Sequence, residues 1–206
     1  VFRVELQQEI GVGLTESGMP YMFALAFYAL FMFLSGKHIE RYQPRNMIIL
    51  GGLLVSVGWI LSSFSTNILL LTIAYGCISG AGVGITYGVL MNVIAKWFPD
   101  KKGLASGLVL VGFGLSPLVT APLARVLVKS IGVMRIFLVS GIGFGIMIPL
   151  LALSFRYPDK DVVQNYESMT SKVRISKEIP LADMIKTRSF KGIYLNFIIG
   201  TMVGLT

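Results

Sequence analysis

The stretch that decides the fold reads ILLLTIAYGCISGAGVGITYGVLMNVIAKW and occupies residues 68–97. It is almost wholly apolar, and an α-helix of this length spans about 45 Å. The hydrocarbon core of a bilayer is ~30 Å thick, so we expect this helix to cross a membrane with tilt or to project beyond it. Glycines recur every four residues at Gly76, Gly80, Gly84 and Gly88, in succession along one helix face. Because small residues let helix backbones approach closely in lipid, we interpret these four as helix-packing residues.

A second face of the same predicted helix is polar. Tyr75, Ser79 and Thr86 share this face, while Tyr87 lies beside the glycines. One side of the helix can therefore pack tightly while another presents hydroxyl groups. Simple packing is the alternative interpretation for each of the four.

Composition indicates an integral membrane protein. The chain has 206 residues, of which 54% are hydrophobic and 14% charged, and its mean hydropathy is +0.76; soluble domains carry roughly 25% charged residues. The net charge of +8 does not indicate nucleic-acid binding, because the bases are spread over loops between apolar spans. The single Cys77 lies in an apolar span without His or Cys nearby, which predicts a packing residue and no metal site. No cofactor is expected.

The apolar pattern predicts an all-α, polytopic membrane bundle. Spans are expected at about 18–36, 46–65, 68–97, 103–127 and 131–155, and together they make residues 1–155 an N-terminal helical half. Residues 156–191 form a polar linker. Residues 192–206 begin a further span, which is too short to cross.

Basic residues predict the orientation. Lys and Arg gather in cytoplasmic loops, and most of the eighteen here lie in 37–45, 96–102 and 156–191. This places the start of the chain outside and the linker in the cytoplasm, in a multi-pass protein of the plasma membrane. An outside start without a signal peptide, and a span cut at Thr206, predict an internal fragment that lacks its first helix. A transporter built of two halves has this layout: a first set of helices, a long linker and a second set of helices.

The fourth span repeats the glycine pattern of the third. Gly103 and Gly107 share a face, so we expect them to pack against another helix. Pro117 and Pro122 predict kinks. In the linker, Leu181, Met184 and Ile185 have helical spacing beside several bases, which predicts a short amphipathic helix on the membrane surface.

The loop GKHIERYQPR, residues 36–45, resembles the loop between the second and third helices of the major facilitator superfamily. Gly36, Glu40, Arg41 and Arg45 match, although Glu40 stands where the family most often has Asp. The resemblance implies a conformational latch in this loop. An acid also favours a helix N-terminus by about 0.3–1 kcal/mol when exposed.

Three further motifs are similar to the oxalate/formate antiporter family within that superfamily. They are GAGVGITYG (80–88), KWFPDKKGLASG (96–107) and GFG (112–114). The resemblance implies transport of small carboxylates through a central cavity lined by aromatic side chains. Tyr87 and Phe113 match cavity positions, with Tyr75, Ser79 and Thr86 as further candidates. The cations that hold the carboxylates in this family lie in the second half, so the missing C-terminal half is an expected partner.

The sequence therefore predicts a secondary transporter of mono- or dicarboxylates, such as oxalate and formate, that works by alternating access. Expected partners are the carboxylate and membrane lipid. A proton-coupled monocarboxylate symporter and a non-transporting membrane receptor remain alternatives. An intramembrane enzyme is disfavoured, because the spans carry no central carboxylate pair and no His/Asp/Glu cluster.

Overall fold

The computed structural model describes residues 11, 13, 16–36, 38–39, 41–157 and 187. Contacts within the chain divide it into two units, Val1–Lys160 and Asp161–Thr206. The amphipathic segment and the further span at 192–206 lie outside the described residues, Thr187 excepted. The architecture below is that of the first unit.

The described helices follow one another with short connections. A turn of 3-10 helix, η1 (Glu16–Gly18), leads into α2 (Met19–Gly36), and α3 (Pro44–Ser62) follows the first loop. The third span consists of α4 (Ile68–Leu71), a π-helical segment η2 (Thr72–Ser79) and α5 (Gly80–Trp97). A short η3 (Pro99–Lys101) then precedes α6 (Lys102–Ile131) and α7 (Val133–Ala152).

The all-α prediction is confirmed. Within the described residues, five helices are long and apolar enough to cross a membrane: Glu16–Gly36, Pro44–Ser62, Ile68–Trp97, Pro99–Ile131 and Val133–Ala152. Local chemistry explains where some of them begin and end. Pro44 supplies a fixed φ at the first turn of α3, and the Asn67 side chain caps the start of α4 by accepting from the Leu69 N–H at 3.2 Å. Gly132, at φ +79°, separates α6 from α7.

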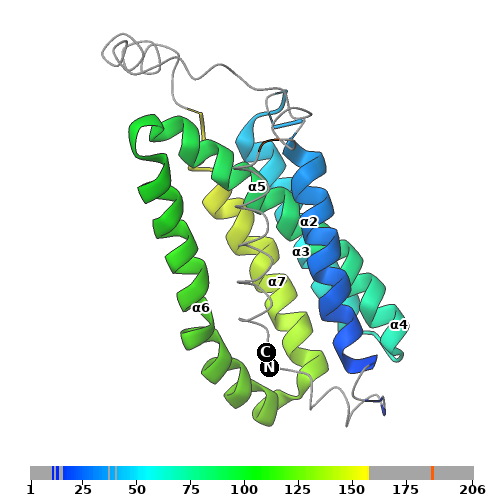
Figure 1. Cartoon of the computed structure of the whole chain (residues 1–206). Helices are drawn as coiled ribbons and strands as arrows, with labels where there is room; N and C mark the ends of the chain where they lie inside the picture. The colour runs from blue at the N-terminus through cyan, green and yellow to red at the C-terminus, as the bar shows by residue number, and fades with distance from the viewer. Residues whose placement is uncertain are drawn as a thin grey trace. The chain divides into compact units, whose positions relative to one another are not determined.

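Helix α2 packs along the third span (Figure 1), and glycines allow the two backbones to lie close together. A Cβ on Gly80 would lie 2.7 Å from the Ala24 carbonyl oxygen, and one on Gly88 would lie 2.9 Å from Ser35 Oγ. Gly84 faces the Tyr28 carbonyl oxygen just as closely. At Gly80 and Gly84 no larger residue fits without displacing the α2 backbone, and at Gly88 the Ser35 side chain would have to move. We call Gly76, Gly80, Gly84 and Gly88 the glycine ladder.

Helix α3 packs against the other side of the third span and also against α7. A Cβ on Gly58 would lie 2.7 Å from both the Ala74 carbonyl oxygen and the Ser79 nitrogen. Towards α7, Ser56 donates a buried hydrogen bond of 2.7 Å to the Gly141 carbonyl oxygen. Helix α3 is thus the element that α5 and α7 share.

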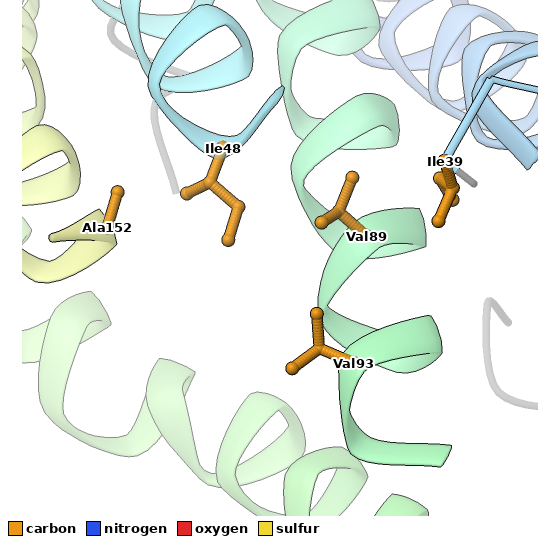
Figure 2. Close-up of a cluster of buried hydrophobic side chains, with 5 residues drawn as sticks. All are labelled: Ile39, Ile48, Val89, Val93 and Ala152. Atoms are coloured by element: carbon orange, nitrogen blue, oxygen red, sulfur yellow. The ribbon is translucent and has the colours of Figure 1, made fainter. Parts of the chain in front are cut away.

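A buried apolar cluster lies between the helices near one end of the bundle (Figure 2). Its members come from the α2–α3 loop and from α3, α5 and α7: Ile39, Ile48, Val89, Val93 and Ala152. Phe155 and Tyr157, which follow α7, pack against it. We call this the Lys96 end, since α5 finishes here.

Helix α6 behaves differently from the rest. None of its residues is buried among the described residues, and a Cβ on Gly103 or Gly107 would meet open space. The helix continues through Pro117 and Pro122 and follows a curved path (Figure 1). The packing role of these two glycines therefore remains a prediction.

Candidate functional site

Three aromatic rings from three helices meet beside the glycine ladder. The Tyr87 ring of α5 lies 5.8 Å from the Tyr28 ring of α2 and 6.1 Å from the Phe113 ring of α6, centroid to centroid. The interplanar angles of 58° and 60° are tilted, which suits the charge distribution of aromatic faces and edges. We call Tyr28, Tyr87 and Phe113 the aromatic trio.

The glycine ladder explains how the two tyrosines come so close. Gly84 lies against the Tyr28 backbone, and Tyr87 follows Gly84 by three residues, almost one helical turn. Close approach of the two backbones thus brings the side chains into contact as well. On α6, by contrast, Phe113 is 64% exposed and keeps an open surface.

The hydroxyl groups of Tyr28 and Tyr87 make no hydrogen bond within the described part of the chain. Both residues are only half-buried. A phenol can both donate and accept a hydrogen bond, and in a membrane interior an unsatisfied polar group costs free energy. The trio therefore offers two hydroxyls and three ring surfaces to a ligand.

Tyr75 belongs to a different aromatic cluster. Its ring lies 5.6 Å from Trp59 and 5.9 Å from Phe137, and Trp59 also contacts Phe144 at 5.2 Å. These rings join the third span to α3 and α7. The structure therefore separates Tyr75 from Tyr87, and the contacts of Tyr75 are those of a packing residue.

Ser79 and Thr86 face α3. Ser79 is 3% exposed and lies against Gly58, while Thr86 lies against Gly51. The Thr86 hydroxyl donates to the Gly82 carbonyl oxygen of its own helix at 3.0 Å. The polar face expected from the sequence is present, and in this structure it is covered. A substrate role for either residue remains a prediction.

The predicted latch loop is described only in part, since Glu40 lies outside the described residues. Gly36 ends α2, and both Arg41 and Arg45 are exposed, with no ion pair among the residues that the structure describes. Ile39 anchors the loop in the buried cluster, and its carbonyl oxygen accepts a 2.9 Å hydrogen bond from the Tyr157 hydroxyl. The latch function stays a prediction.

Tyr28 was not a predicted site residue. It is one of several aromatic residues along α2, and its contact with Tyr87 depends on how α2 lies against α5, so no pattern in the sequence marks it. The Tyr157–Ile39 bond joins residues far apart in sequence, and no local pattern marks it.

No charged side chain accompanies the trio. Within α2–α7 as described, Lys and Arg lie towards helix ends, as Arg45, Lys96, Lys102, Arg125, Lys129 and Arg135 do. Among the described residues, the trio presents rings and hydroxyls to a ligand. A charged ligand would therefore need a countercharge from elsewhere.

Comparison with known proteins agrees with this architecture. The chain is 34% identical over 155 residues to the oxalate:formate antiporter of Oxalobacter formigenes, covering 75% of this chain and 36% of the relative. It is 26% identical over 171 residues to the uncharacterized MFS-type transporter YhjX of Escherichia coli (strain K12), 83% of this chain and 41% of that protein. It is also 31% identical over 121 residues to monocarboxylate transporter 13 of Bos taurus, 59% of this chain and 25% of that protein.

The chain thus spans between a quarter and about two fifths of the length of these relatives. The profile that describes the Major Facilitator Superfamily matches residues 1–206. Together with five membrane-length helices, this match makes the protein a multi-pass membrane protein of a transporter family. The chain belongs to the Major Facilitator Superfamily.

Proposed function

We propose that the protein exchanges small organic anions, mono- or dicarboxylates such as oxalate and formate, across the membrane by alternating access. The observation that carries the proposal is the aromatic trio, whose two hydroxyls make no hydrogen bond within the described residues. A carboxylate accepts hydrogen bonds only, so two phenol donors suit it. The names of the oxalate:formate antiporter and of monocarboxylate transporter 13 support this class of substrate.

We propose that the positive charge that balances the bound carboxylate comes from outside this chain. A carboxylate in a low-dielectric site needs a paired charge or several donors, and the described membrane helices supply only donors at the trio. We therefore propose that a second half of the transporter, the partner expected from the sequence, provides the cations. The fraction of the relatives' length that the chain covers is consistent with this division.

A counterflow assay, which follows exchange of substrate across a vesicle membrane, tests the proposed transport. The full-length protein is reconstituted into vesicles loaded with unlabelled oxalate or formate, and entry of labelled substrate is followed. We expect transient accumulation of label, reduced about tenfold or more by Tyr87→Ala because two ring contacts and one hydroxyl are lost. Binding without any exchange would instead support a receptor.

A proton-coupled monocarboxylate symporter is the second candidate, because several relatives are named monocarboxylate transporters. Symport removes protons from the medium along with the substrate. External alkalinisation on addition of lactate or formate to energised vesicles would favour it. An antiporter would exchange substrates at the same rate with or without a proton gradient.

We further propose that the Lys96 end faces the cytoplasm of the plasma membrane, as do the linker residues 156–191. The cluster of bases at this end supports the orientation. In a Cys77→Ser background of the full-length protein, single cysteines replace His38 and Ser130. A membrane-impermeant maleimide applied to intact cells should label position 130 and spare position 38, and the reverse pattern would overturn the orientation.

A further inference from the structure

An apolar hollow opens at the Lys96 end, apart from the aromatic trio. It measures about 410 Å³ and lies between the end of α5 and the residues that follow α7. Val93, Ile94 and Phe155 form apolar walls, and Trp97, Ser154 and Arg156 also line it. Val93 belongs at the same time to the buried cluster of Figure 2, so the floor of the hollow is part of the core.

Two side-chain bonds hold the walls in place. The Trp97 indole donates to the Arg156 carbonyl oxygen at 2.8 Å, and the Tyr157 hydroxyl donates to the Ile39 carbonyl oxygen at 2.9 Å. The Lys96 Nζ lies 4.4 Å from the centroid of the Tyr157 ring, a cation–π distance. The chain after α7 is therefore fastened to α5 and to the α2–α3 loop, and the hollow is preformed.

Among the described residues, the charged side chains at the hollow and after the end of α5 are mostly basic. Arg156 lies at the hollow itself, and exposed Lys96, Lys101 and Lys102 follow in α5, η3 and α6, with Asp100 as the acid among them. Trp97 and Phe98 are exposed at the end of an apolar span, where aromatic side chains meet lipid headgroups. An apolar hollow with a cationic rim at this depth suits a ligand that is apolar at one end and anionic at the other.

We propose that this hollow binds an anionic phospholipid, with acyl chain against Val93, Ile94 and Phe155 and phosphate against Arg156 and the neighbouring lysines. Basic pockets at the ends of membrane helices recognise lipid headgroups in this way. The proposal rests on the membrane placement of the helices and is independent of the transported substrate.

A segment of the chain itself is the competing occupant of the hollow, and charge favours the lipid over that segment. The amphipathic segment expected around residues 181–185 contains Asp183 and is followed by Lys186, Arg188 and Lys191, so its net charge has the same sign as the rim. The positive segment and the positive rim repel each other. A negatively charged lipid phosphate is attracted to the rim when the distance between them is about one Debye length or less. A zwitterionic lipid has no net charge to contribute.

The experiment measures thermal unfolding of the delipidated full-length protein in detergent. Phosphatidylglycerol, phosphatidylcholine with the same acyl chains, and inorganic phosphate are titrated separately. We expect phosphatidylglycerol to raise the unfolding midpoint by about 3 °C or more, since a ligand bound to the folded state stabilises it. Phosphatidylcholine should raise the midpoint by less, and inorganic phosphate should leave it unchanged. An equal rise with both lipids would overturn the proposal. A rise with inorganic phosphate alone would overturn it as well and would assign the site to a free anion.

Two variants locate the lipid. Arg156→Gln should raise the half-saturating phosphatidylglycerol concentration about fivefold, whereas Arg125→Gln, on exposed α6, should leave it unchanged. Ser154→Trp places a large ring in the hollow and should abolish the shift even where Arg156→Gln folds poorly. If Arg156→Gln and Ser154→Trp both respond like the wild-type protein, the lipid lies elsewhere and the proposal fails. Counterflow is measured separately, so failure of the carboxylate proposal leaves this result intact.

Discussion

The third span and α6 both carry glycines four residues apart, but these glycines have opposite surroundings. Gly80 and Gly84 lie against the carbonyl oxygens of Ala24 and Tyr28, while Gly103 and Gly107 face open space within the described structure. The difference lies in the neighbour. Helix α2 presents backbone atoms at matching four-residue intervals, and no described helix does so for α6. Small-residue spacing thus prepares a helix for close packing, and a partner in register is needed to complete it.

The largest expected effect comes from filling the glycine ladder. Gly84→Leu would place a side chain against the Tyr28 carbonyl oxygen, which the α2 backbone holds in place. We expect a loss of about 3 kcal/mol in the free energy of unfolding, measured by denaturation of the purified protein in detergent.

Gly107→Leu is the matched control, because its Cβ meets nothing within the described residues. Its effect should stay within about 0.5 kcal/mol. Equal losses at both positions in the full-length protein would mean that another element covers α6 in register, and the contrast between the two helices would disappear.

A smaller effect separates the aromatic trio from the Tyr75 cluster. Tyr87→Phe removes a hydroxyl that is free to meet substrate, so initial exchange rates should fall about tenfold with little change in stability. Tyr75→Phe keeps the ring contacts with Trp59 and Phe137 and should transport at the wild-type rate. A greater transport defect at Tyr75 than at Tyr87 would reverse the assignment of the two tyrosines.

The smallest effect tests hydrogen bonds in the packed and the open region. Ser56→Ala deletes a buried bond between α3 and α7, and such bonds in membranes contribute about 0.6 kcal/mol on average. Ser116→Ala on α6 deletes an exposed bond to Phe113 of the same helix and should change the unfolding free energy by less. Denaturation curves of the two variants measured side by side give the comparison, and a larger loss for Ser116 would contradict it.

The span pattern and the fold class could be predicted from sequence because both depend on local composition. Apolar length identifies a membrane helix, and four-residue spacing shows which residues share its face. Pattern alone does not say which helix meets that face. The sequence showed Tyr75, Ser79 and Thr86 on one side of the third span, but only the structure shows that α3 covers that side.

The contacts that assemble the two sites are the part that sequence could not supply. Tyr28 meets Tyr87 because two helices align, and Trp97 meets Arg156 because the chain after α7 turns back across α5. Each contact depends on the relative placement of elements far apart in the chain. Single-sequence periodicity carries no information on that placement.

The π-helical segment Thr72–Ser79 has a consequence for how the third span tolerates mutation. In an α-helix each step of four residues overshoots a full turn by about 40°, so a straight ladder of glycines would rotate away from α2. In a π-helix the hydrogen bond spans five residues instead of four, so each residue turns the helix by a smaller angle, which offsets this rotation between Gly76 and Gly80. The segment keeps the glycines on the side of the helix that faces α2, and this effect depends on its number of residues. Deleting one residue there would remove the extra residue that the wider turn needs and return the segment to α-helical geometry, whereas conservative substitutions would leave its number of residues intact.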